Sequence, residues 1–148
     1  RSIFLQQLEY QKLSFQTPPV IDVLSKTGVL AEMKTNISLI EYRSEQDVRF
    51  HLKQAKDDEI VVVSIKHGLG TDYSLAETEP TITGDASKIK YTPLQTLDTR
   101  TTMAHVYEVL EDQRDGATLI MSTDGDKVMG IVLWEQLHTI LMKRYALA

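Results

Sequence analysis

The sequence predicts an α+β (α/β) fold in which one unit of strand, helix, strand, strand and helix occurs twice, with pseudo-two-fold symmetry. The expected elements recur in the same order with an offset of 57 residues, from Ile60 to Ala117. The central strand of the first copy is a continuous apolar run, which is typical of a strand buried on both faces. A repeat of this length indicates two copies of one supersecondary unit packed together.

The first copy is expected to contain an extended stretch, a helix, a buried strand and a returning strand, at residues 37–42, 44–55, 60–66 and 72–77. Ser44 and Asp47 stand where a capping box begins the helix. The glycines of residues 67–71 supply the turn between the two strands. The stretch that should hold the second helix runs into Pro80, which would break a long helix.

The second copy retraces this order with an extended stretch, a helix, a buried strand, a returning strand and a closing helix, at residues 93–97, 101–112, 117–122, 127–133 and 134–144. Thr101 or Thr102 is expected to cap its first helix. The TDGD sequence at 123–126 predicts a hairpin turn. Residues 77–92, between the copies, are polar with one proline and one glycine, so we predict a linker there.

Residues 1–29 are predicted to form a helical lead-in that packs on the core. Apolar residues with helical spacing predict a short helix at its start. Thr17 can cap a second helix, which Pro18 and Pro19 would begin and Gly28 would end.

Composition and charge exclude several classes of function. The 148 residues carry a formal net charge of -5, and their lysines and arginines do not cluster, which argues against a nucleic-acid partner. The chain has no cysteine, which excludes thiol catalysis and disulfides. Its longest aliphatic run, residues 60–65, is too short for a membrane span of ~20 residues. Because the chain starts at Arg1 without a methionine, we expect it to be part of a longer protein.

No catalytic or metal-binding motif stands out, and we predict that the protein is not an enzyme. The histidines fall on separate expected elements without metal-ligand spacing. The acidic run at 57–59 is expected to be a solvated loop. Asp124 and Asp126 flank Gly125 as residues of a turn, because the rest of a calcium loop is missing.

A short stretch near the C-terminus carries a family signature. In tandem cystathionine-β-synthase-type (CBS) domains, the second strand pair ends in glycine, two aliphatic residues, serine or threonine, two variable residues, aspartate and leucine. The stretch from Gly130 to Leu137 matches this ending except that Leu133 replaces the serine or threonine and Gln136 replaces the aspartate. Through these residues the sequence resembles a tandem CBS-domain pair.

The N-terminal part resembles the segment that joins the last membrane helix of chloride-channel (CLC-type) transporters to their cytoplasmic CBS pair. That segment contains an "LE…GL" stretch and a "GV…M" stretch, and the matching residues here are Leu8, Glu9, Gly28, Val29 and Met33. The resemblance implies that residues 1–29 are a linker from a membrane domain, 30–82 the first CBS repeat and 83–148 the second.

The resemblance implies a regulatory function. CBS pairs of this family form a flat body, dimerise through their helices and often hold adenosine nucleotides. We therefore expect a homodimeric cytoplasmic module of an integral (plasma or inner) membrane protein. It would contact the membrane domain of a chloride channel or transporter and modulate gating or assembly. The alternative is an adenine-nucleotide-sensing CBS module of another transporter or an enzyme, with ATP, ADP or AMP as the candidate ligand.

The candidate nucleotide-binding residues are Gly130, Ile131, Leu133 and Gln136. In nucleotide-binding relatives the aspartate accepts hydrogen bonds from both ribose hydroxyls, each contributing ~1.5–3 kcal/mol. A glutamine is neutral and accepts through one carbonyl oxygen, so it is a weaker ribose ligand. The other interpretation places Gln136 on an exposed helix face and Leu133 in the core.

Overall fold

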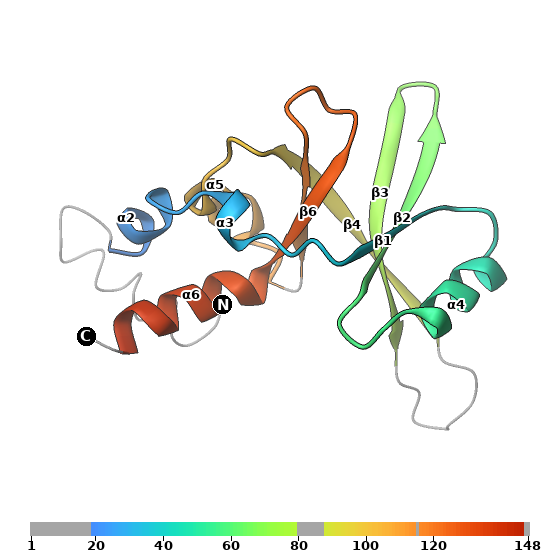
Figure 1. Ribbon diagram of the computed structural model, residues 1–148, viewed down its shortest axis with the longest axis horizontal. Helices are drawn as coiled ribbons and strands as arrows, with labels where there is room; N and C mark the ends of the chain where they lie inside the picture. Colours follow the sequence, from blue (N-terminus) through green and yellow to red (C-terminus); the bar gives the residue numbers. More distant parts are fainter. Residues whose placement is uncertain (1–18, 80–87, 115, 147–148) are drawn as a thin grey trace. The chain divides into compact units, whose positions relative to one another are not determined.

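The computed structural model describes residues 19–79, 88–114 and 116–146, which contain five helices and six strands (Figure 1). The chain divides into two compact units. We call residues 35–95 the central unit, and Arg1–Lys34 together with Thr96–Ala148 the terminal unit. The short helix predicted near residue 3 lies outside the described residues. Thr17, the predicted cap of the second helix, lies outside them too. No helix in the described part of the chain is long and apolar enough to cross a membrane.

The central unit is a small sheet with one helix. Its elements in chain order are β1 (Ile37–Glu41), α4 (Glu45–Gln54), β2 (Ile60–His67), β3 (Gly70–Glu79) and the larger part of β4 (Lys88–Asp98). β1 pairs with β2 in parallel, and β2 with β3 and β3 with β4 pair in antiparallel. The predicted extended stretch, helix and strand pair of the first copy are therefore confirmed.

Helix α4 covers one face of this sheet. The Ser44 side chain accepts a hydrogen bond from the Asp47 backbone N–H at 3.1 Å, so Ser44 caps the helix as predicted. Val48 is fully buried against Val61 and Val63, which point to the same sheet face because they are two positions apart on β2.

The prediction of a linker at residues 77–92 is wrong where the structure describes it. Residues 77–79 continue β3, and residues 88–92 belong to β4. The register places Glu77 opposite Lys90 and Glu79 opposite Lys88, and cross-strand pairs of opposite charge stabilise antiparallel strands. The charged residues that resembled a linker thus specify strand pairing.

Among the described residues, the first copy contains strand, helix, strand and strand, without the second helix of the predicted repeat. In the described part of the central unit, the element that follows β3 is the strand β4, where the repeat predicts a helix. β4 begins in the central unit and ends in the terminal unit. The mixed α+β class is confirmed, whereas two equivalent copies in tandem stay a prediction.

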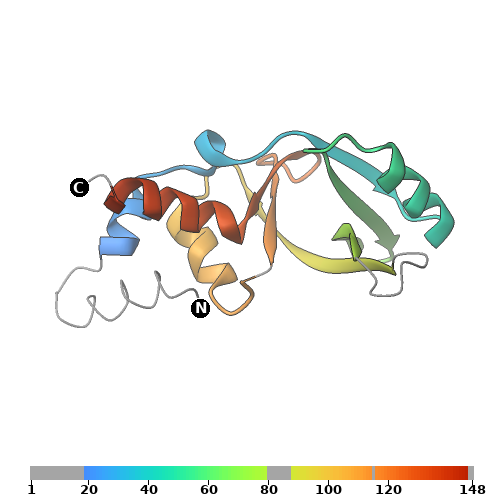
Figure 2. The ribbon, with the colours of Figure 1, turned by 90° about the horizontal axis from the view of Figure 1, so that it is seen from below.

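The terminal unit is a hairpin packed with helices. Its elements are α2 (Pro19–Ser25), α3 (Val29–Glu32), α5 (Met103–Leu110), β5 (Ala117–Met121), β6 (Val128–Leu133) and α6 (Trp134–Ala146). Helix α5 contacts both α2 and α6 (Figure 2). The fully buried side chains at its centre include Leu24, Met103, Leu110, Leu137 and Leu141. All elements predicted for the second copy are present.

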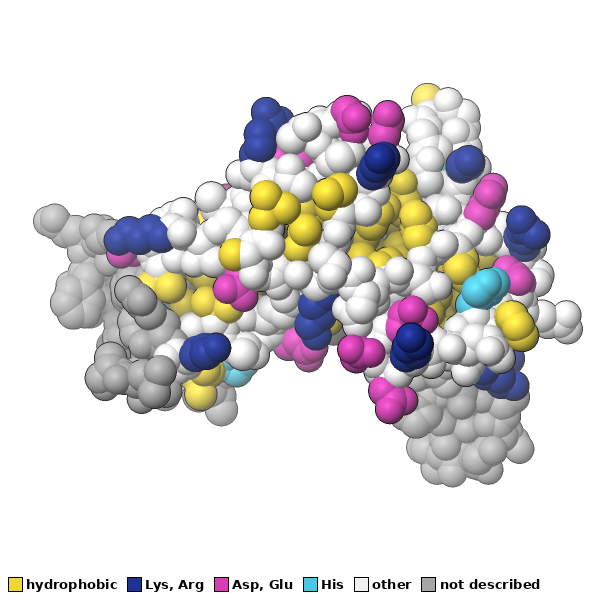
Figure 3. All heavy atoms as spheres, viewed as in Figure 1, with side chains coloured by type: hydrophobic (Ala, Val, Ile, Leu, Met, Phe, Trp, Pro, Cys, Tyr) yellow, Lys and Arg dark blue, Asp and Glu magenta, His cyan; other side chains and the backbone are white. Residues whose placement is uncertain are grey.

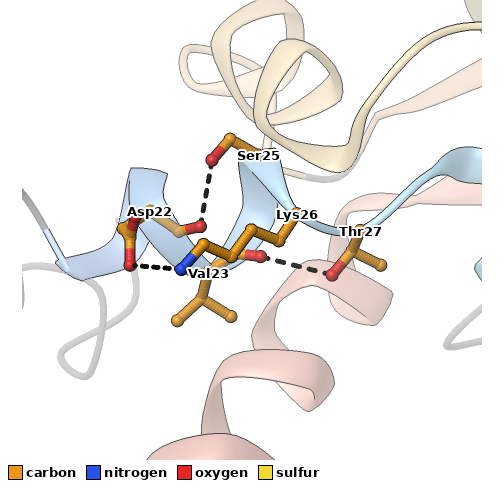
Figure 4. A network of polar contacts seen from close by, with 5 residues as sticks. All are labelled: Asp22, Val23, Ser25, Lys26 and Thr27. Carbon is orange, nitrogen blue, oxygen red and sulfur yellow. Dashed lines mark hydrogen bonds and ion pairs between the residues drawn. The ribbon is translucent and has the colours of Figure 1, made fainter.

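Hydrogen bonds end α2 earlier than the sequence predicts. The Ser25 hydroxyl donates to the Asp22 carbonyl oxygen at 2.9 Å, and the Thr27 hydroxyl donates to the Val23 carbonyl oxygen at 3.2 Å (Figure 4). These bonds satisfy carbonyl groups that have no partner inside the helix. Gly28 therefore does not end α2, and instead precedes the first residue of α3.

Two turn and cap predictions for the second copy are confirmed. Thr102 caps α5 by accepting the His105 backbone N–H. In the β5–β6 turn, the Asp124 carboxylate accepts hydrogen bonds from the Ser122 hydroxyl at 2.5 Å and the Asp126 N–H at 3.0 Å, and these bonds lower the pKa of Asp124. Gly125 has a φ of 78°, which favours glycine. Turn geometry thus accounts for both aspartates.

Surface charge follows the composition. On the face shown in Figure 3, lysine and arginine side chains are interspersed with aspartate and glutamate side chains.

Replacing Thr118 with valine is predicted to stabilise the protein by about 1 kcal/mol. Thr118 is fully buried on β5 opposite Val132, and within the described residues its hydroxyl has no hydrogen-bond partner. Valine has nearly the same shape and removes the desolvation cost of that hydroxyl. Urea unfolding measures the change.

The control is Thr139→Val on α6, where the exposed hydroxyl donates to the Glu135 carbonyl oxygen at 3.0 Å. We expect this exposed substitution to change stability by less than about 0.5 kcal/mol. Loss of stability in Thr118→Val would show that the hydroxyl has a partner in solution.

Candidate functional site

The candidate site lies where β6 ends at Leu133 and α6 begins at Trp134. The Leu133 backbone N–H donates to the Gln136 side-chain oxygen at 2.8 Å. A glutamine in the third position of a helix that reaches back to the residue before it is one half of a capping box. The other half needs a serine or threonine hydroxyl, which Leu133 lacks. The first role of Gln136 is therefore to begin α6.

The nitrogen of the same amide makes a second internal hydrogen bond. Gln136 Nε2 donates to the Glu32 backbone carbonyl oxygen at 2.7 Å, at the end of α3. Carbonyl groups at a helix end lack partners within the helix, so this bond satisfies one of them. Gln136 is half-buried, so the expectation of an exposed helix residue is wrong. Leu133 is also half-buried and does not belong to the fully buried core.

The chain that follows α3 pairs with β6 beside this amide. The Lys34 N–H donates to the Ile131 carbonyl oxygen at 2.8 Å, and the Ile131 N–H donates to the Lys34 carbonyl oxygen at 2.9 Å. This reciprocal pair is one rung of an antiparallel ladder. Ile131 therefore contributes its backbone, while its side chain is fully buried.

Gly130 permits the close approach of this segment. A Cβ atom at position 130 would stand 2.6 Å from the Met33 sulfur and 2.9 Å from the Lys34 carbonyl oxygen. Real Cβ atoms do not come that close to other heavy atoms, so a side chain here would push the segment away from β6. The glycine of the signature thus has a packing role in this chain.

We call residues 30–34 the strap. A pocket of ≈ 300 Å³ lies beside the strap and α6, and it is lined by Glu32, Lys34, Glu135, Gln136, Thr139 and Ile140. Its volume is at the lower end for small-molecule sites. Two carboxylates and one ammonium group give the lining a net negative charge, which does not favour phosphate groups.

All four candidate residues lie at this junction, where each already makes contacts within the chain. Both polar groups of Gln136 are engaged by the backbone, and Gly130 and Ile131 hold the strap. Sequence reasoning did not identify the strap residues Glu32 and Lys34, which act partly through backbone atoms. No group of three or more histidine, aspartate or glutamate side chains suited to a metal ion occurs among the described residues.

The fold is that of CBS domains. No protein-family model matches the chain, and no curated protein sequence matches it. Solved structures do: the CBS domain of the bacterial CNNM/CorC family Mg²⁺ transporter is 13% identical with a TM-score of 0.55, over 95% of this chain and 96% of that chain. The same domain in complex with ATP is 13% identical with a TM-score of 0.56, over 83% and 92% of the two chains.

A third structure, that domain with an inhibitor, is 11% identical with a TM-score of 0.55, over 93% of this chain and 94% of that chain. At such identities the likeness shows the fold alone. It confirms that the chain has the mixed α+β fold of CBS domains. The chloride-channel resemblance gains no support from these structures, which are domains of Mg²⁺ transporters.

Replacing Gly130 with alanine is predicted to destabilise the protein by about 2 kcal/mol. The added Cβ meets the Lys34 carbonyl oxygen, which cannot retreat without losing its bond to the Ile131 N–H. Thermal unfolding followed by circular dichroism measures the effect.

Gly68→Ala is the matched control, since a Cβ there meets nothing within 4 Å and its φ is not positive. We expect Gly68→Ala to unfold within a degree or two of the native protein. Equal melting temperatures for Gly130→Ala and the native protein would contradict the close approach of the strap.

Proposed function

We propose that the chain is a regulatory CBS module of a membrane transport protein, which modulates gating or assembly of the membrane part. The supporting observation is the likeness in fold, over almost the whole chain, to CBS domains of an Mg²⁺ transporter. In this proposal the module lies on the cytoplasmic side and forms a homodimer through its helices. Its role is structural coupling, with no catalytic step. The chloride-channel type rests on the N-terminal resemblance in sequence alone.

The attachment of the N-terminal segment supports a coupling role. Val29, one of the positions that resemble the entry from a membrane domain, is fully buried, and its N–H donates to the Thr101 carbonyl oxygen at 3.0 Å. The Met103 N–H donates to the Thr27 carbonyl oxygen at 2.8 Å. These bonds attach the segment to the start of α5, and in this proposal movement of the chain before Thr27 would pass to α5 through them.

Deleting the module is predicted to change ion flux severalfold in the full-length protein that contains it. The protein is reconstituted into liposomes, and flux of Mg²⁺ and of chloride is measured with and without these residues. Chloride flux would support the chloride-channel type, and Mg²⁺ flux would support the type of the solved structures.

A variant with Val29→Asp keeps the membrane part and the full length of the chain but places a charge in the core of the terminal unit, which destabilises the module without removing it. Unchanged flux in both the deletion and Val29→Asp would refute a regulatory role. A full-length protein without any membrane part would refute the transport assignment itself.

Adenine-nucleotide binding is the second candidate function. One specific observation favours it: a solved CBS domain of similar fold is in complex with ATP. The hydrogen bonds of the Gln136 side chain to Leu133 and Glu32 argue against it, because a ribose would have to displace them. The candidates ATP, ADP and AMP share the ribose and adenine, so the same junction would serve all three.

The Gln136→Asp variant is predicted to bind ATP, ADP or AMP about thirtyfold more tightly than the native protein, because a carboxylate gains ~2 kcal/mol over an amide in accepting from ribose hydroxyls. Isothermal titration calorimetry of the purified chain measures both affinities.

Gln136→Asn is the control, because it shortens the side chain and loses the internal bonds as aspartate does, but remains neutral. We expect it to bind nucleotide no better than the native protein. Tight binding by the native protein would make it a nucleotide sensor and overturn the order of the two candidates.

A further inference from the structure

The strap is much less buried than the residue that precedes it. Its first residue, Leu30, is 59% exposed, and none of residues 30–34 is fully buried. Val29, immediately before it, is 0% exposed and belongs to the core of the unit. Segments with few buried apolar contacts open at a lower free energy than the core to which they attach.

Hydrogen bonds join the strap to β6 and α6. They are the reciprocal backbone pair between Lys34 and Ile131 and the bond from Gln136 Nε2 to the Glu32 carbonyl oxygen. The Met33 side chain adds a partly buried apolar contact over Gly130. Gln136 is the one side chain among them that reaches from α6 to the strap, so its amide acts as a latch.

The pocket described above has the strap on one side and α6 on the other. Glu32 and Lys34 line it from the strap, and Glu135, Thr139 and Ile140 line it from α6. Gln136 lines the pocket too, and its amide spans from one side to the other. Lifting the strap would therefore widen the pocket and free the polar groups of Gln136 at the same time.

We propose that residues 30–34 open and close as one unit over this pocket, hinged at Val29 and latched by Gln136. The closed state satisfies Gln136 internally. In the open state its amide, the Glu32 carbonyl and the backbone of Ile131 are available to a ligand. Any ligand that hydrogen-bonds to Gln136 would favour the open state, and opening would favour that ligand. This inference does not depend on the proposed function.

Amide hydrogen exchange of the chain, followed residue by residue by NMR, tests the strap directly. In the native protein we expect the N–H groups of Lys34 and Ile131 to exchange with one shared opening constant. The N–H group of Val29, at the hinge, and that of Met103, in the core, should exchange more slowly because both are bonded to buried segments that do not open with the strap.

Gln136→Glu tests the latch. A carboxylate still accepts the Leu133 N–H but cannot donate to the Glu32 carbonyl oxygen. Exchange at Lys34 and Ile131 should become about tenfold faster, the effect of losing one hydrogen bond of ordinary strength. Exchange at Val29 and Met103 should stay at the native rate.

Glu135→Gln is the matched control, because it exchanges the same two side-chain groups at the adjacent exposed position of α6. It should leave all four rates unchanged. Equal acceleration at all four amides in Gln136→Glu, or one common rate in the native protein, would show that the strap does not open separately and would overturn the proposal. The native measurement decides even where the variant fails to fold.

Discussion

The Gln136 side-chain amide is the interaction on which the candidate site depends. Its oxygen begins α6 at Leu133, and its nitrogen ends α3 at Glu32. Each bond satisfies a backbone group that a helix end leaves without a partner, and unsatisfied buried groups of this kind cost about 1–3 kcal/mol. A single neutral side chain thus joins the strap to α6. A carboxylate at this position could accept the bond from the Leu133 N–H but could not donate the bond to the Glu32 carbonyl oxygen.

The other features of the junction follow from this attachment. Because the strap must lie against β6, position 130 has no room for a Cβ atom, and the backbone of Ile131 is used for pairing. The residues that resemble a nucleotide signature therefore serve the packing of this chain. Nucleotide binding at the junction requires that a ligand compete with these internal contacts.

The parts of the fold that a residue type specifies locally could be predicted from the sequence. Ser44 and Thr102 cap helices because their side chains reach nearby N–H groups, and the TDGD turn forms through its own polar groups. The first part of β4, residues 88–92, could not be predicted, since Lys88 and Lys90 indicate a strand only when they lie opposite Glu79 and Glu77. The Gln136 nitrogen donates to a backbone carbonyl 104 residues away in the sequence. Every residue has such a carbonyl, so the residue types alone do not predict this bond.

The most direct test of the central claim is NMR of the Gln136 side-chain amide, through its scalar coupling across the hydrogen bond to the Glu32 carbonyl carbon. We expect a measurable coupling in the native protein and slow exchange of the bonded amide proton. A side-chain amide with averaged shifts and no coupling would contradict it, because Gln136 would then be free to serve a ligand instead of holding the strap.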